Sequence, residues 1–208
     1  AYKYSLGGGY RKSHGWEPLG LVDYYDTFGP ELSFGKTLEK KFTENIAIAK
    51  FTHSGSQIID WTPEGSMAED RHLYPRFISF IKESLKELTD KGSEVELAGV
   101  FYHLGENDMS FHPYRKQAAE RLQAIVNQSR KDLDVPKLKW FVSQQPPTDD
   151  KRVNNLDVVA DVEKVAAGDE TIIHLKAFDL PPQEKKLVID TAGIVRLGEF
   201  LADSYLKK

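Results

Sequence analysis

The sequence predicts a mostly parallel α/β domain in which helices cover both faces of a central sheet, a three-layer α/β/α sandwich. Three observations predict it. Short apolar runs of strand length alternate with longer segments in which apolar residues recur at helical spacing. Polar residues follow several of these runs without a spacer, as at the carboxyl ends of parallel strands. The chain also has 208 residues, 40% of them hydrophobic and 29% charged, which is enough for one good-sized core.

The first elements are expected as follows. Residues 1–30 are rich in Gly, Tyr and Pro without periodicity, so they are predicted to be ordered loop. Pro30 suits the first position of a helix over 30–42, and Glu31 is favourable near its positive end. A short buried strand is predicted over 46–51.

The rest of the chain alternates helices and strands. Apolar residues at helical spacing predict helices over 74–88, 113–135, 156–167 and 194–205. Apolar runs predict strands over 97–102, 138–142 and 171–175. Lys91 and Gly92 are expected to end the first of these helices, Pro136 the second and Gly168 the third, while Thr191 is the expected N-cap of the last. Helical connections of this length imply right-handed βαβ units with parallel strands.

Composition excludes several classes of partner. The net charge is −4 and the pI is about 5.9, so there is no broad positive surface for nucleic acid or for an anionic membrane. No stretch approaches the roughly 20 apolar residues that cross a bilayer, and the first residues lack the apolar core of a secretion signal. Cysteine is absent, which excludes disulfides and thiolate zinc sites. We expect no nucleic-acid partner and no membrane span.

One polar cluster follows the predicted strand over 97–102 and contains His103, Glu106, Asn107 and Asp108. Ligands bind outside the carboxyl ends of the strands in open α/β sheets, so this cluster is a candidate site. Its carboxylates and amide could position a substrate or a catalytic partner, or could hold a turn by bonding local backbone. His103 and Glu106 have no evident third ligand for a metal, so no metal or cofactor is expected.

A second cluster follows the predicted strand over 46–51 and contains Ser54, Gly55 and Ser56. Gly55 lets a ligand approach the backbone closely, and N–H groups of such a turn can stabilise an oxyanion. The alternative is a glycine that serves only the turn. Trp61 is expected to cover the site or to fill the core. Because parallel strands end at one edge of a sheet, the two clusters are expected to face each other.

Four blocks of sequence occur in a specific order and spacing. They are 28–35 (FGPELSFG), 54–56 (SGS) with Asp60 and Trp61, 102–108 (YHLGEND), and 190–193 (DTAG) with Leu197 and Gly198. Together they resemble the serine-dependent carbohydrate O-acetylesterases of the SGNH hydrolase superfamily, of the sialate O-acetylesterase and acetylxylan-esterase-like type. The resemblance runs from about residue 28 to the end of the chain.

The resemblance implies a single SGNH hydrolase-like domain of flavodoxin-like architecture over 1–208. It also implies that the Gly55 N–H contributes to an oxyanion hole. The family's nucleophile block, Gly-Gln-Ser-Asn after the first strand, has no match, so the domain is expected to lack that strand and its serine. Leu104 stands where the family has an oxyanion glutamine. Val188 and Lys185 stand where its final block has a histidine and an aspartate.

We therefore predict a carbohydrate O-acetylesterase-like domain that deacetylates an acetylated sugar by serine-type acyl transfer if the nucleophile is supplied. The base would be His103 or, as an alternative, His53. The partner is an acetylated carbohydrate or oligosaccharide, and relatives of this type suggest a bacterial protein that is exported or periplasmic. The predicted pocket is lined by Ser54, Gly55, Ser56, Trp61, His103, Glu106, Asn107 and Asp108.

The competing prediction is a catalytically inactive domain on the same scaffold that binds carbohydrate or a partner protein. A valine accepts no proton and a leucine side chain donates no hydrogen bond, so the departures remove parts of the hydrolytic machinery. Aromatic side chains near the start would suit stacking on sugar rings, although they could equally pack the loop: Tyr10, Trp16, Tyr24 and Tyr25. A metal-dependent hydrolase is the third alternative.

Overall fold

The structure is a computed structural model, and it describes residues 1–7, 11–22, 26–104, 117–144, 155–177, 180 and 189–207. The chain divides into two compact units. The first consists of Ala1–Ser54, Asp179–Glu184 and Val188–Lys208, and the second of Gly55–Phe178 and Lys185–Leu187. Each unit is described by itself.

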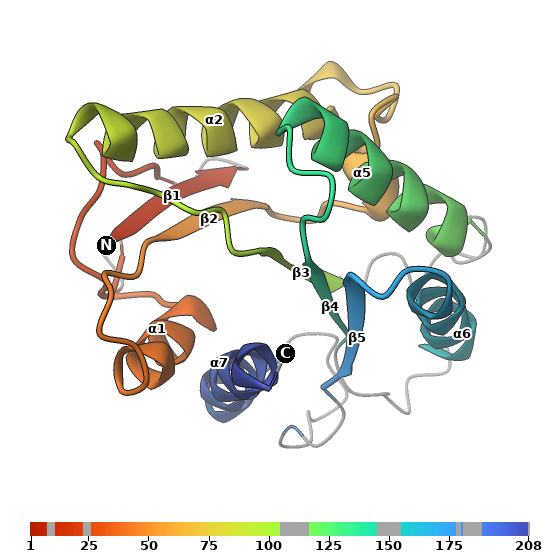
Figure 1. Cartoon of the computed structure of the whole chain (residues 1–208). Coiled ribbons are helices and arrows are strands. Elements are labelled where there is room, and N and C mark those ends of the chain that lie inside the picture. The colour runs from red at the N-terminus through yellow and green to blue at the C-terminus, as the bar shows by residue number, and fades with distance from the viewer. Residues whose placement is uncertain are drawn as a thin grey trace. The chain divides into compact units, whose positions relative to one another are not determined.

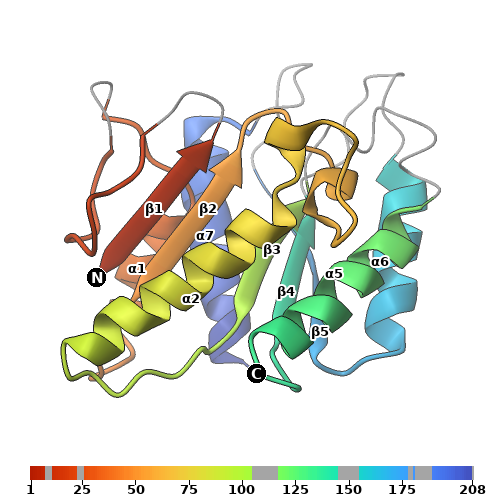
Figure 2. The ribbon, with the colours of Figure 1, turned by 90° about the horizontal axis from the view of Figure 1, so that it is seen from above.

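The first unit holds two parallel strands and two helices. Strand β1 (Tyr2–Gly7) pairs with β2 (Ile48–His53), and Figure 2 shows the two arrows pointing the same way. Helices α1 (Glu31–Glu39) and α7 (Thr191–Leu206) pack against each other. Residues 12–17 return along the other edge of β1 in antiparallel bridges.

The prediction of loop over 1–30 is wrong for β1. Tyr2, Tyr4 and Leu6 alternate with polar residues, which is the period of a strand, and tyrosine is itself a strand former. The rings of Tyr2 and Tyr4 are buried together in a small core. The loop prediction followed from the many glycines and prolines after Gly7 and overlooked the short alternating run before them.

The second unit contains the three-stranded parallel sheet β3-β4-β5. Its strands are β3 (Val100–Leu104), β4 (Trp140–Gln144) and β5 (Ile172–Lys176). Its helices are α2 (Tyr74–Asp90), α5 (Ala118–Asp132) and α6 (Asn155–Ala167), and two short 3₁₀ helices precede α2, η1 (Ile58–Trp61) and η2 (Glu69–Arg71). Every strand pair is parallel, which confirms the predicted sheet type (Figure 1). The predicted helices and strands all occur, with ends shifted by a few residues.

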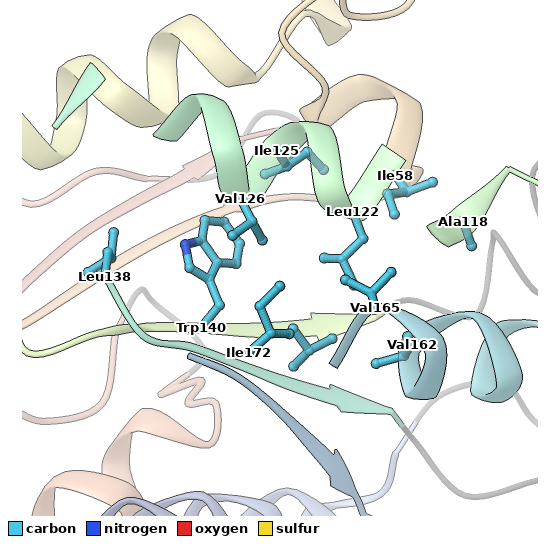
Figure 3. Close-up of a cluster of buried hydrophobic side chains, with 11 residues drawn as sticks. Ile58, Ala118, Leu122, Ile125, Val126, Leu138, Trp140, Val162, Val165 and Ile172 are labelled. Carbon is cyan, nitrogen blue, oxygen red and sulfur yellow. The ribbon is translucent and has the colours of Figure 1, made fainter. Parts of the chain in front are cut away.

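A hydrophobic core lies between this sheet and its helices, and Figure 3 shows its side chains converging. Trp140 is buried at the start of β4, and helices α5 and α6 supply aliphatic side chains that pack around it. The 3₁₀ helix η1 contributes Ile58, which is 1% exposed. The segment after Gly55 is therefore fastened to the core of the second unit.

The N-cap of α7 is Asp190 and not Thr191, which corrects the sequence-based assignment. The Asp190 side chain accepts a hydrogen bond of 2.7 Å from the Gly193 N–H, while Thr191 is already the first helical residue. We expect Asp190→Ala to lower the free energy of unfolding by about 1 kcal/mol, because a free N–H is left at the helix start. Urea unfolding would measure it, with Thr191→Ala as the control. An equal loss in both variants would contradict the assignment.

Candidate functional site

The turn after β2 leaves its backbone open on one side. Gly55 has a φ of +66°, a conformation that favours glycine. Apart from its chain neighbours, no atom of the described residues lies within 4 Å of the position that a Cβ would take there. Ser54 is exposed and Ser56 is half-buried. The structure thus shows a turn that needs glycine, and the binding of a ligand at this backbone stays a prediction.

Trp61 fills the core below this turn. Its ring makes edge-on contacts with Phe77 of α2 and Tyr102 of β3, with centroid distances of 6.1 and 6.2 Å. Such contacts add to the burial of apolar area. Of the two roles expected for Trp61, the geometry gives it the packing role.

His103 faces Ser143 across neighbouring strands. The two residues are register partners of β3 and β4, and His103 Nδ1 lies 2.8 Å from Ser143 Oγ. The other ring nitrogen, Nε2, is sealed from solvent and has no hydrogen-bond partner among the described residues. Burial lowers the pKa of His103 to about 4. The imidazole is therefore neutral at pH 7 and is a weak base.

A second polar pair lies one residue further along β4. His174 Nε2 of β5 is 2.5 Å from Gln144 Oε1. Burial also lowers the pKa of His174 below its usual value. Sequence reasoning ended this strand at 142 and placed Ser143 and Gln144 after it, but both are buried strand residues. Their polar character, directly after an apolar run, was the available signal.

His53 ends β2 and offers a different imidazole environment. Its Nδ1 lies 3.0 Å from the Ser54 carbonyl oxygen, which can only accept a hydrogen bond. The ring therefore carries its proton on Nδ1, and Nε2 is left as the acceptor. The His53 side chain is half-buried, so this acceptor belongs to a ring that solvent reaches.

The predicted loop carboxylates Glu106 and Asp108, together with Asn107, lie outside the described residues. So do Lys185 and Val188, which replace the family's final-block residues. Leu104 is the last residue of β3. The expectation that the Gly55 turn faces the loop after β3 stays a prediction.

Neither metal nor membrane features emerge from the described part of the chain. Within it, no three His, Asp or Glu residues gather as in a metal site. The helices it contains are too short or too polar to span a bilayer.

The low pKa of His103 makes stability depend on pH. In the unfolded chain the imidazole takes up a proton near its usual pKa of 6.5, whereas the folded state resists protonation down to about pH 4. The unfolded state binds more protons between these values, so the free energy of unfolding falls as the pH falls. The full loss is about 3 kcal/mol.

Urea unfolding at several pH values between 7 and 4 would measure this loss. His103→Gln should flatten the dependence over that interval. His174→Gln is the matched control, because burial also lowers the pKa of this half-buried imidazole. An unchanged slope in the His103 variant would contradict the assignment.

The parallel strands and the helices between them are those of an α/β protein with an SGNH-like fold. The family model for carbohydrate esterases described as sialic acid-specific acetylesterases matches residues 13–207. The chain belongs to this carbohydrate esterase family.

Solved structures show the same fold. A protein from Arabidopsis thaliana superposes with a TM-score of 0.69 at 21% identity, over 100% of this chain and 81% of that one. A carbohydrate acetylesterase from Xanthomonas citri superposes with a TM-score of 0.64 at 17% identity, over 83% of this chain and 39% of that one. No curated protein sequence matches the chain significantly.

Proposed function

We propose that the chain belongs to a carbohydrate O-acetylesterase that removes an acetyl group from a sugar hydroxyl. The observation that carries the proposal is the Gly55 turn, in a chain of this esterase family. Its positive φ and the open space on its Cβ side let a small ligand approach the backbone there, and backbone N–H groups of a turn can hold the oxygen of an acetyl carbonyl. An acetyl ester is small and neutral, so such a turn can hold it without a metal or cofactor.

The nucleophile is proposed to be a serine outside the described residues. Ser143 is hydrogen-bonded to His103, but it is only 1% exposed and no substrate carbonyl can reach its Oγ. Ser54 and Ser56 flank the glycine of the turn, and the nearby His53 bonds to the Ser54 carbonyl oxygen and to no serine hydroxyl of the described residues. The Gly-Gln-Ser-Asn block that the family uses therefore remains the best source of the serine.

The edge of β3 supports an additional strand at this place. Among the described residues β3 pairs only with β4. The strand β4 is completely buried, whereas the side chains of Val100, Phe101 and Tyr102 on β3 are only half-buried. An apolar run of this kind is typical of a strand covered on both sides, and an open apolar edge is a pairing site. We propose that a parallel strand carrying the serine binds there.

The proposed reaction has two steps. The serine oxygen attacks the acetyl carbonyl, the oxyanion is held by the Gly55 turn, and the sugar oxygen leaves with the proton that the base took from the serine. Water then attacks the acetyl-serine, releases acetate and restores the serine. His103 and His53 are the candidate bases within the described residues. If His103 is the base, activity falls only below about pH 4, where its imidazole becomes protonated.

The test uses the product of the whole gene, a fluorophosphonate probe and an aryl acetate. Labelling that persists in the Ser54→Ala, Ser56→Ala and Ser143→Ala variants, together with acetate release, supports a serine outside the described residues. Loss of labelling in one of these variants would move the nucleophile to that residue. A protein that neither reacts with the probe nor releases acetate would overturn the esterase proposal. His53→Gln and His103→Gln then identify the base.

A second candidate function, carbohydrate binding without hydrolysis, is favoured by a hollow in the first unit. This hollow has a volume of about 440 Å³ and is lined by Tyr4, Arg11, Lys12, His14 and Glu17. Its lining contains two basic residues, Arg11 and Lys12, and one acidic residue, Glu17, although the chain as a whole carries −4. The carboxylate of an acidic sugar would suit this balance. Calorimetry with an acidic sugar and a neutral one, on a protein without turnover, distinguishes this function from the esterase.

A further inference from the structure

Gly7 and His53 are the last residues of β1 and β2 and lie opposite each other in the strand register. Side chains at these two positions therefore share one face of the strand pair. The His53 ring occupies the space beside Gly7, because a Cβ built there would lie 2.6 Å from His53 Cδ2 and 3.1 Å from Cγ. Carbon atoms in contact usually lie about 3.5–4.0 Å apart. A side chain at position 7 would thus displace the ring.

A hydrogen bond holds the other side of the same ring. His53 Nδ1 lies 3.0 Å from the Ser54 carbonyl oxygen, so Nδ1 carries the proton of the neutral ring and Nε2 is the acceptor. Among the described residues Nε2 has no hydrogen-bond partner, and it is not one of their unpaired atoms that are sealed from solvent. The space at Gly7 and the bond at Nδ1 together fix the direction in which Nε2 points.

Of the two candidate bases, only His53 offers an acceptor that solvent reaches. His103 Nε2 is sealed, and burial lowers the pKa of that imidazole to about 4. His53 also precedes Gly55 by two residues, so the chain itself keeps their Cα atoms within about 7 Å of each other. A general base must come within about 3 Å of the group whose proton it takes. His53 therefore has the better placed and better exposed nitrogen.

We infer that His53 is the base of the proposed esterase and that Gly7 is its positioning residue, because glycine leaves room for the ring. This inference rests on the proposed function. Nε2 takes the serine hydroxyl proton as the serine oxygen bonds to the acetyl carbon, and gives it to the sugar oxygen as the bond to that oxygen breaks. Nε2 then takes a proton from the attacking water and returns it to the serine oxygen as acetate leaves. Gly7 acts only through the ring.

The test combines variants of both residues in the whole-gene product. We expect His53→Gln to lower kcat for an aryl acetate roughly 100-fold or more. Gly7→Ala should lower kcat roughly 10- to 100-fold with little change in KM, because its Cβ turns the ring. In a His53→Gln background, Gly7→Ala should cost no further activity. Gly20→Ala is the matched control, since no atom of the described residues beyond its chain neighbours lies within 4 Å of its Cβ position, and it should leave kcat unchanged.

Nitrogen-15 NMR of the His53 ring gives a readout that does not depend on turnover. The neutral ring of the wild type should carry its proton on Nδ1, whereas Gly7→Ala should show both tautomers, because the turned ring loses the Ser54 oxygen. If Gly7→Ala does not fold, Gly7→Ala with His53→Ala should fold, since no ring is left to overlap. If the wild type shows no turnover, the proposed function fails, and the NMR comparison still decides whether Gly7 sets the ring.

Three results would overturn the inference. The first is a kcat of His53→Gln within twofold of the wild type. The second is a loss on Gly7→Ala that is equally large with and without His53, in activity or in folding. The third is an unchanged tautomer of His53 in Gly7→Ala.

Discussion

Lys50→Met is expected to lower the free energy of unfolding by about 3 kcal/mol, because it leaves the Glu31 carboxylate buried without its cation. Lys50 Nζ lies 2.9 Å from both carboxylate oxygens, and the two side chains are 21% and 7% exposed. The Tyr2 hydroxyl and the Gly29 N–H also donate to Glu31 Oε1, at 3.0 and 3.1 Å. These bonds tie β1, α1 and β2 together. Urea unfolding of the variant would measure the loss.

Two further variants separate the ion pair from its surroundings. Glu31→Gln combined with Lys50→Met removes both charges while keeping an acceptor for Tyr2 and Gly29, so it should recover a large part of the loss. Lys86→Met breaks the exposed Lys86–Asp90 pair, whose side chains are 72% and 60% exposed, and should cost under about 0.5 kcal/mol. A loss of that small size in Lys50→Met would show that water reaches Glu31.

The pattern of the sequence was sufficient for the sheet type and for the helices, because both depend on periodicity within a short stretch. The ion pair of Glu31 is an interaction that such local patterns cannot predict. Its position in the first turn of α1 predicted a favourable interaction with the helix dipole, which is correct but incomplete. The cation that pairs with it lies 19 residues away on β2. Only the folded chain brings these residues together.

In the candidate site, too, local sequence patterns predicted some features, whereas contacts between distant residues were not predicted. Gly55 was predicted from a local signal, a glycine between hydroxyl residues directly after a strand. The hydrogen bond from Arg71 to the Gly55 carbonyl oxygen was not predicted. Arg71 lies 16 residues from Gly55, and no local pattern distinguishes it from the other charged residues. Burial of His103 against Ser143 likewise depends on the register of β3 and β4, which no local pattern specifies.

Because α1 and α7 pack closely, Gly198→Ala is also expected to lower the free energy of unfolding by a large amount. A Cβ at Gly198 would overlap the Pro30 carbonyl oxygen and Ser33 Oγ, and would lie 2.9 Å from the Phe34 nitrogen. Alanine favours a helix by about 1 kcal/mol over glycine, so propensity alone predicts stabilisation. The overlap includes backbone atoms, which a rotamer change cannot move, and the helices must separate. We expect a net loss of about 3 kcal/mol, at the upper end of overpacking costs.

Gly35→Ala on α1 is the matched control for Gly198→Ala. Its Cβ would meet the ends of the Leu19 and Ile48 side chains, which can rotate away, so the loss should stay under about 1 kcal/mol. The two helices are also joined by a hydrogen bond of 2.8 Å from Ser33 Oγ to the Val195 oxygen, which separation would break. Urea unfolding of both variants is the measurement. Equal losses would mean that the helices slide apart at little cost and that the glycine is not needed for their contact.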